Sequence, residues 1–215
     1  MDFVALEAIR CLQKIDKDNE YIIFVANGED HCLEETPNMH IVTLECPTYP
    51  LWEQWALRRA VKKVGADLLH CTSNTAPIFG STPLVVTLHD IIFLEKQSGR
   101  NPSIYQALGR IYRRFVVPKI LPKCKRIITV SKFERQRILS SLNLPPEKIV
   151  AIYNGYNSQF HPLEDFQTTV SKYIQNDSYI FFLGNTDPKK NTPGTLKAYA
   201  EYVRKSQHPD MLLLA

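Results

Sequence analysis

The feature that most constrains this fold is a run of mainly apolar, β-branched residues from Leu84 to Leu88, which ends abruptly at His89 and Asp90. A short apolar run bounded by Pro83 predicts a strand that is buried on both faces of a parallel sheet. Polar residues at the carboxyl end of such a strand lie where open α/β sheets bind their ligands. We therefore expect a rigidly held His-Asp pair at the edge of a ligand site.

Two further apolar runs end in the same way. The run from Arg126 to Ser131 stops at a serine, and the run from Lys148 to Gly155 stops at Asn154 and Gly155. Because parallel strands end at one edge of their sheet, we expect small polar groups from three strands to gather there. This arrangement is typical of a cleft for a sugar or a nucleotide.

Strand patterns alternate with helical patterns along the chain. This alternation predicts an α/β fold, a Rossmann-like parallel sheet with helices on both faces. The unbroken apolar character of Leu84–Leu88, Ile127–Val130 and Ile149–Ile152 predicts that these strands form the centre of the sheet. The expected strands are Tyr21–Ala26, His40–Glu45, Asp67–Cys71, Leu84–Asp90, Arg126–Ser131, Lys148–Tyr153, Tyr179–Leu183 and Met211–Leu214. The expected helices are Val4–Ile15, Leu51–Val64, Ser103–Val117, Lys132–Leu142 and Thr192–Ser206.

A domain boundary is predicted between His161 and Ser178, where a polar stretch interrupts the pattern and indicates a linker. The expected parts are a first domain at 1–161, a linker at 162–178, and the start of a second domain at 179–215. The chain opens with a helix, although doubly wound domains generally open with a strand, and no helix follows its last strand. We expect the sequence to be incomplete at both ends, or partners to cover the exposed edges.

The composition is that of an ordinary globular protein, with 44% hydrophobic and 22% charged residues among 215. No apolar stretch approaches the roughly 20 residues of a membrane-spanning helix, and the first residues carry no secretory cleavage site. The five cysteines are scattered and none forms a C-x-x-C pair. Neither a metal site nor a disulfide framework is therefore indicated, and the expected location is the reducing cytoplasm.

Basic charge is concentrated in one segment. Residues 96–133 hold ten Lys or Arg and no Asp or Glu, and the basic residues from Arg110 to Arg126 alternate with aromatic and aliphatic ones. Two interpretations stay open: the solvated face of a helix, or a surface that binds anionic lipid peripherally at the inner face of a membrane. Nucleic acid is not an expected partner, because no nucleic-acid-binding motif accompanies the charge.

Six segments stand in an order that resembles a known family: WEQ, DLLHCTSNTAP, PLVVTLHD, RIITVSKFERQRI, LPPEKIVAIYNGYNSQFHP and YIFFLGNTDPKKNTPGTLKAY. The ordered set resembles the retaining group 1 glycosyltransferases (family 4), which have the GT-B fold. The resemblance implies two Rossmann-like domains facing each other across a cleft, the first holding the acceptor and the second a nucleoside-diphosphate sugar. It also implies that basic side chains and helix dipoles, in place of a bound metal or cofactor, neutralise the departing diphosphate.

The resemblance gives roles to residues of the first domain. His89 resembles the catalytic histidine at the cleft floor, which contacts the donor sugar near the reacting carbon. Ser131 lies at a strand-to-helix turn that faces the cleft. Asn154 and Gly155 match the turn that leads out of the first domain.

In the second domain, Gly184 and Lys190 match a loop whose lysine approaches the donor diphosphate, beside a helix N-terminus that favours an anion. Many family members have arginine directly after this glycine, whereas this chain has Asn185, and Lys189 is the candidate to replace that charge. Both lysines could instead form a solvated turn. The family's Glu-x7-Glu motif, first strand and glycine-rich loop are not found in residues 1–215, so we expect a fragment that does not transfer sugar by itself.

Other assignments have structural alternatives. His89 could cap a strand or satisfy a core hydrogen bond, and Ser131 could act only as a helix N-cap. Asp90 and Glu53 are expected to line the cleft. Asp90 could equally bond the backbone amides of the following loop, and Glu53 could mark a helix start flanked by core tryptophans.

These features leave two functions open and speak against a third. The first is a retaining transferase that moves a hexose, such as mannose or glucose, from a nucleoside-diphosphate sugar to a glycan or lipid-linked acceptor. The second is a catalytically incomplete fragment that acts only as a binding or interaction module. The third is a dinucleotide-dependent Rossmann enzyme, against which the chain has no G-x-G-x-x-G after any strand.

Overall fold

The computed structural model describes residues 2–28, 32–95, 104–157, 160–162, 164–174, 178–185 and 190–215. The chain divides into two compact units, Met1–Asn157 and Ser158–Ala215. The mixed α/β class with parallel strands is confirmed in both.

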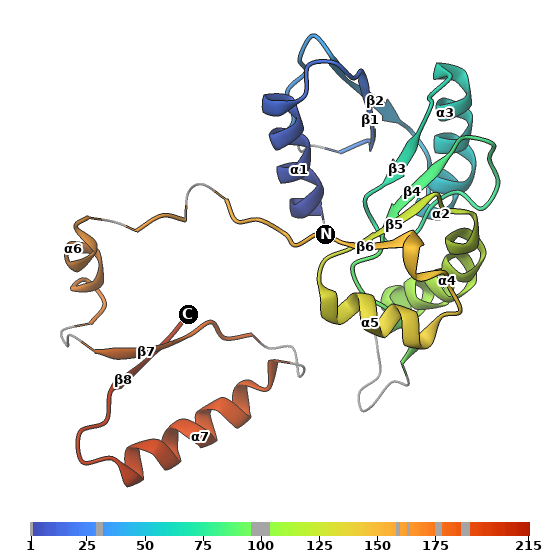
Figure 1. Ribbon diagram of the computed structural model, residues 1–215. Coiled ribbons are helices and arrows are strands. Elements are labelled where there is room, and N and C mark those ends of the chain that lie inside the picture. The colour runs from blue at the N-terminus through green and yellow to red at the C-terminus, as the bar shows by residue number, and fades with distance from the viewer. Residues whose placement is uncertain are drawn as a thin grey trace. The chain divides into compact units, whose positions relative to one another are not determined.

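The first unit alternates helices with strands, as the sequence pattern predicts (Figure 1). Its strands are β1 Tyr21–Ala26, β2 Met39–Leu44, β3 Leu69–Cys71, β4 Leu84–Thr87, β5 Arg126–Thr129 and β6 Ile149–Ala151. Its α-helices are α1 Asp2–Ile15, α2 Tyr49–Leu51, α3 Arg58–Val64, α4 Ile104–Ile120 and α5 Lys132–Ser141. A π-helix, η1 Trp52–Leu57, joins α2 to α3, and short 3-10 turns are η2 Ile92–Leu94, η3 Leu121–Lys123 and η4 Pro146–Lys148.

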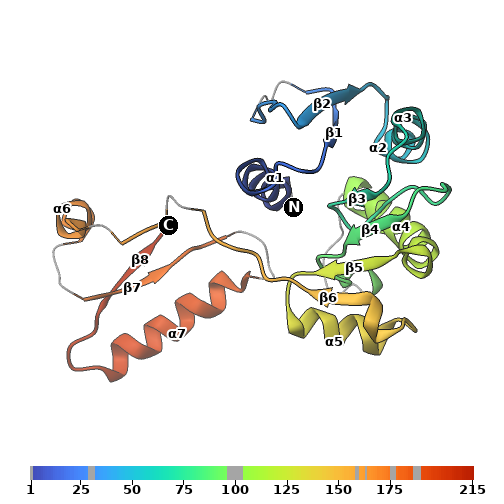
Figure 2. The same cartoon turned by 45° about the horizontal axis from the view of Figure 1, so that its top comes forward.

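The strands of the first unit form two parallel sheets. β3, β4, β5 and β6 lie side by side in that order, with Val86 opposite Ile127 and Ile127 opposite Ile149 (Figure 2). β1 and β2 form a separate two-stranded sheet, although the sequence pattern predicts one sheet. Because the carboxyl ends of β3, β4 and β5 share one edge, the loops that follow these strands are brought together.

The prediction that Ile149–Ile152 lies at the centre of the sheet is wrong. β6 is an edge strand of the four-stranded sheet, and only Ile149 of this run is buried, whereas Val150 and Ile152 are exposed. An apolar, β-branched run reports on strand propensity, and it does not by itself distinguish a central strand from an edge strand.

The core of the first unit forms between β4, β5 and the helices α4 and α5. The fully buried side chains include Val86 and Leu88 at β4, Ile127 on β5, Val117 on α4 and Ile138 on α5. Leu88 continues the path of β4, since its backbone N–H donates to the carbonyl of Ile128 at 2.8 Å. The backbone position at which His89 and Asp90 begin is therefore buried and held by a hydrogen bond to β5.

The second unit is a β-α-β arrangement preceded by a short helix, α6 Phe166–Val170, which falls within the expected linker. β7 Tyr179–Phe182 pairs in parallel with β8 Met211–Leu214, and α7 Thr192–Lys205 connects them, as predicted. The Tyr199 hydroxyl on α7 fastens this crossover, because it donates to the Asp210 carbonyl and accepts from the Leu212 N–H.

Candidate functional site

His89 follows β4 directly and is held by the loop after the neighbouring strand β3. Its backbone N–H donates to Asn74 Oδ1 at 2.8 Å, and its ring Nε2 lies 2.9 Å from the Thr72 carbonyl oxygen. Since a carbonyl oxygen only accepts, Nε2 carries the proton, and Nδ1 of the neutral ring is the acceptor. The side chain is half-buried. The imidazole is thus fixed in orientation and tautomer at the predicted edge of the sheet.

Asn74 was not among the residues singled out from the sequence. Its side chain is 3% exposed, and its amide oxygen receives the His89 N–H. The available signal was its position in the polar stretch that follows β3, at the same strand edge as His89. Asn74 fixes the backbone of the histidine, while the carbonyl of Thr72 fixes its ring.

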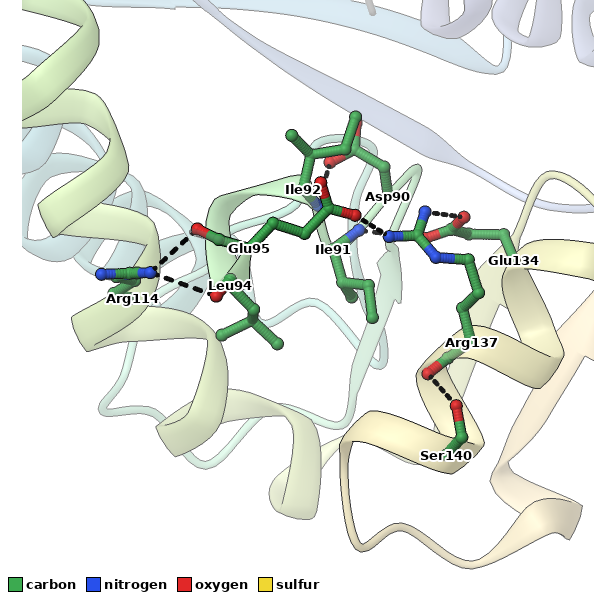
Figure 3. Close-up of polar contacts among 9 residues, drawn as sticks. All are labelled: Asp90, Ile91, Ile92, Leu94, Glu95, Arg114, Glu134, Arg137 and Ser140. Atoms are coloured by element: carbon green, nitrogen blue, oxygen red, sulfur yellow. Dashed lines mark hydrogen bonds and ion pairs between the residues drawn. The ribbon is translucent and has the colours of Figure 1, made fainter. Parts of the chain in front are cut away.

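Asp90 begins the loop Asp90–Glu95, which we call the β4 loop. Its Oδ1 accepts the backbone N–H of Ile92 at 3.1 Å, which is the structural alternative raised from the sequence (Figure 3). Ile91 and Phe93 are 3% and 4% exposed and anchor the loop in the core. The β4 loop therefore has both a turn made by its own side chain and an apolar anchor.

Glu134, on the first turn of the helix α5 that follows β5, binds the backbone of the β4 loop. Its carboxylate accepts the Ile91 N–H at 3.0 Å and lies 2.9 Å from Nη1 of Arg137 (Figure 3). Arg137 also pairs with Glu95 at the end of the loop. Glu134 is only 6% exposed, so this carboxylate is a buried acceptor placed for one backbone amide.

Ser131 is the N-cap of α5, as the structural alternative held. Its Oγ accepts the Glu134 N–H at 3.0 Å. Serine followed three residues later by glutamate is the sequence pattern of a capping box, in which the glutamate side chain returns to the N–H of the cap residue. Here that side chain reaches the N–H of Ile91 instead, so half of the capping box is used to hold the β4 loop.

Arg114 holds the β4 loop from α4. Its Nε donates to the Phe93 carbonyl at 2.7 Å, and its Nη2 lies 3.1 Å and 3.2 Å from the carbonyls of Leu94 and Glu95 (Figure 3). One guanidinium thus satisfies three consecutive carbonyls of the loop. Side chains of α4 and α5 together fix the β4 loop, which directly follows His89.

Glu53 does not line an open cleft. It is 2% exposed, within the π-helix η1, and both carboxylate oxygens accept hydrogen bonds. Oε1 receives the hydroxyls of Thr75 at 2.6 Å and Tyr49 at 2.8 Å, and Oε2 receives the Tyr112 hydroxyl at 2.6 Å and the Gln54 amide at 2.9 Å. We call these five residues the Glu53 network. Of the two tryptophans expected in the core beside it, Trp52 is half-buried and Trp55 is 57% exposed.

The Glu53 network holds the loop between β3 and β4. Gln54 accepts the Ile78 N–H at 2.8 Å and donates to the Ala76 carbonyl at 3.1 Å. Burial and the adjacent carboxylate raise the pKa of the Tyr112 phenol well above its ordinary value near 10. Since Thr75 follows Asn74 directly, the network fixes the segment that holds the backbone of His89.

Asn154 and Gly155 follow the edge strand β6, which is separated from β4 by β5. Both residues are exposed. Among the described residues, no hydrogen bond joins Ser131 or Asn154 to His89. A single cleft formed by these three residues therefore stays a prediction.

In the second unit, Gly184 lies where β7 ends against β8. Its N–H donates to the Ala215 carbonyl at 2.7 Å, and a Cβ atom at this position would lie 3.2 Å from Leu214 Cδ1. The Asn185 carbonyl accepts the Thr192 hydroxyl at 2.6 Å, at the start of α7. Lys190 is exposed, and Lys189 lies outside the described residues. The predicted phosphate loop thus adjoins a helix N-terminus in its own unit.

No group of three or more His, Cys, Asp or Glu side chains in the described ranges is arranged to hold a metal ion. No helix among those ranges is long and apolar enough to cross a membrane.

Most of the first unit is similar to known glycosyltransferases. Residues 3–160 match the model of Glycosyltransferase Family 4. The chain is 27% identical over 150 residues to the O-antigen chain mannosyltransferase RfbU of Salmonella typhimurium, a match that covers 68% of this chain and 37% of that protein. It is 29% identical over 119 residues to the O-antigen chain mannosyltransferase B of Escherichia coli, covering 54% of this chain and 30% of that protein. The matched stretches thus span about a third of the length of these relatives.

Proposed function

Because this chain belongs to Glycosyltransferase Family 4, we propose that its protein transfers a hexose from a nucleoside-diphosphate sugar to a glycan or lipid-linked saccharide, with retention at the anomeric carbon. The similarity to two O-antigen chain mannosyltransferases supports mannose as the first hexose to test and a polysaccharide as the acceptor. The observation that carries the proposal is the family match over 3–160, which includes the fixed histidine at the carboxyl end of a central strand.

His89 is the proposed catalytic residue. With Nε2–H held on the Thr72 carbonyl, the ring keeps Nδ1 as an acceptor for a donor-sugar hydroxyl near the reacting carbon. A group that is already oriented needs no reorganisation when the transition state forms, and this is the main way in which such polar contacts accelerate a reaction. Asn74 is a positioning residue, because it holds the His89 backbone and has no proposed contact with substrate.

The leaving diphosphate requires positive charge, and we place it at the loop of the second unit. Lys190 and the N-terminus of α7 supply a cation and the positive end of a helix dipole, and Gly184, Asn185 and Lys189 complete the loop that would surround the phosphates. The proposal includes no resident metal or cofactor. The five cysteines are free thiols, which suits the cytoplasm proposed as the location.

The test is a donor screen. The product of the full reading frame is incubated with a panel of nucleoside-diphosphate hexoses and with lipid-linked oligosaccharides, and nucleotide release is measured with and without acceptor. We expect acceptor-dependent release with one hexose donor and an α-linked product from an α-linked donor by NMR. Release that never depends on acceptor, or an inverted product, would contradict the proposal.

A further inference from the structure

Five large apolar side chains lie exposed on α4, a helix of 17 residues, and four of them share one side of the helix. Their exposed fractions run from 57% for Phe115 to 85% for Tyr105. We call this set the apolar stripe; it consists of Ile104, Tyr105, Leu108, Ile111 and Phe115.

The apolar stripe is not the face that α4 uses to pack on the first unit. Positions 104, 108, 111 and 115 are three or four residues apart and therefore fall on one side of the helix. Val116, Val117 and Ile120 are fully buried and form the packed face. Single exposed apolar residues are normal on a protein surface, but a contiguous set of this size marks an interaction surface.

The charge beside the apolar stripe has one sign. Residues 104–133 contain no Asp or Glu. Lys119 is exposed, with its Nζ 3.0 Å from the centre of the Phe115 ring and 3.2 Å from the Phe115 carbonyl of its own helix. Lys123, just beyond the end of α4, is also exposed and donates to the Ile78 carbonyl at 2.9 Å, so each lysine makes one carbonyl contact, whereas Arg114 makes three. Apolar side chains bordered by cations are typical of helices that lie at the surface of anionic bilayers.

Arg114 is not available to that surface, although the sequence alone offers it as a lipid-binding base. Its guanidinium is occupied by the carbonyls of Phe93, Leu94 and Glu95. Reversing the charge at Arg114 would therefore disturb the β4 loop, and a docking experiment needs Lys119 instead. The same contact joins α4 to the loop that follows His89.

We propose that the apolar stripe of α4 docks on the surface of a bilayer that contains anionic lipid. The occupant is a bilayer because residues 104–133, which include α4 and the turn after it, carry bases and no acids, and this charge complements an anionic surface. The helix would lie in the plane of the interface with its apolar face buried among the lipid headgroups. Docking does not depend on the proposed transfer reaction, although it would hold the protein where a lipid-linked acceptor lies.

The experiment is co-sedimentation of the protein with vesicles of phosphatidylcholine alone or with added phosphatidylglycerol. We expect partitioning to be about tenfold higher on the anionic vesicles and to fall as salt is added. In a Leu108→Trp variant, the emission should shift to the blue on the anionic vesicles and be quenched by brominated acyl chains, each measured as the difference from the unmodified protein, in which only Trp52 and Trp55 emit. This second readout reports burial of the stripe itself.

Matched variants separate the stripe from general surface properties. The double variant Leu108→Ser/Ile111→Ser should lower partitioning by at least roughly tenfold, because two apolar side chains lose their burial. Leu196→Ser and Val203→Ser together remove exposed apolar side chains from α7 and should leave partitioning unchanged. Lys119→Glu should weaken binding to the anionic vesicles, whereas Lys197→Glu, an exposed lysine on α7, should have little effect.

Three results would overturn the proposal: equal binding to neutral and anionic vesicles, unchanged binding in the Leu108→Ser/Ile111→Ser variant, and a Leu108→Trp emission that vesicles do not shift. If those variants instead abolish self-association in sedimentation velocity, the stripe covers a second copy of the protein and not a bilayer. Each readout works without any sugar donor, so failure of the transferase proposal and failure of docking remain distinguishable.

Discussion

The carboxylate of Glu134 accepts the backbone N–H of Ile91, two residues after His89, at 3.0 Å. This bond links the start of α5 to the β4 loop, which directly follows the candidate catalytic histidine (Figure 3). Because Ile91 is 3% exposed, its N–H has no access to water as a substitute partner. The conformation of the β4 loop is thus stabilised by a side chain of α5, the helix that follows the neighbouring strand β5.

Glu134→Ala should lower the free energy of unfolding by about 1–3 kcal/mol, because a buried N–H is left without an acceptor and Arg137 loses a partner. Glu134→Gln keeps an amide oxygen for Ile91 and should recover part of that loss. Urea unfolding of both variants measures the difference, with Glu147→Ala as an exposed-glutamate control. Equal stability of Glu134→Ala and the unmodified protein would show that the bond does not hold the loop.

His89→Ala should lower turnover by roughly a hundredfold or more, the usual range for a side chain that acts on the reacting groups. The same variant should unfold at nearly the same denaturant concentration, because the side chain is only half-buried. Steady-state rates with the donor found in the screen, measured beside the unfolding curve, separate the two effects. If turnover stays near the unmodified value, His89 is only part of the strand end, held by Thr72 and Asn74.

The order and type of the regular elements could be predicted from local patterns. The apolar runs with β-branched residues correctly predicted the strands β4 and β5. The N-cap role of Ser131 could be predicted from its position directly before a helical pattern. The edge position of β6 could not be predicted, since edge and centre strands share the same short apolar signal.

The contacts that hold the candidate site could not be predicted from the sequence. The spacing of Ser131 and Glu134 favours a capping box, which would direct the glutamate to the wrong amide. Arg114 lies in a basic segment where the pattern indicates either solvent or lipid, yet it binds three carbonyls of the β4 loop. Side-chain direction at such positions is set by packing between elements distant in sequence, and a single chain shows only the residue types.

Cys124 should resist alkylation in the folded protein. It is 1% exposed, and burial raises the pKa of its thiol to about 11, so almost none of it is thiolate at neutral pH. Cys11 and Cys32 are exposed and should react first. Maleimide labelling followed by peptide mass spectrometry measures the order, and urea should bring Cys124 to the rate of the other two. Rapid labelling of Cys124 without urea would show that the end of α4 opens readily.

Tyr112 should make the first unit sensitive to alkaline pH. Its pKa is raised in the folded protein by burial and by the Glu53 carboxylate, so the folded state keeps the phenol proton above pH 10 while the unfolded state releases it. The unfolded state then binds fewer protons, and the free energy of unfolding must fall as the pH rises above the ordinary pKa of tyrosine. This contribution is fully present below about pH 10. Tyr112→Phe should be less stable at neutral pH by about 1–3 kcal/mol, because Glu53 loses a hydrogen bond inside the fold.

The same Tyr112→Phe variant should lose stability less steeply than the unmodified protein between pH 9 and 11, since it has no phenol to ionise at this position. Urea unfolding followed at several pH values gives both slopes, and absorbance at the phenolate band gives the titration directly. Tyr156→Phe is the control, because Tyr156 is 84% exposed and outside the Glu53 network. Parallel slopes for Tyr112→Phe and Tyr156→Phe would mean that the Tyr112 phenol ionises in the folded protein as readily as an exposed one, and the Glu53 network would then have to be open to solvent.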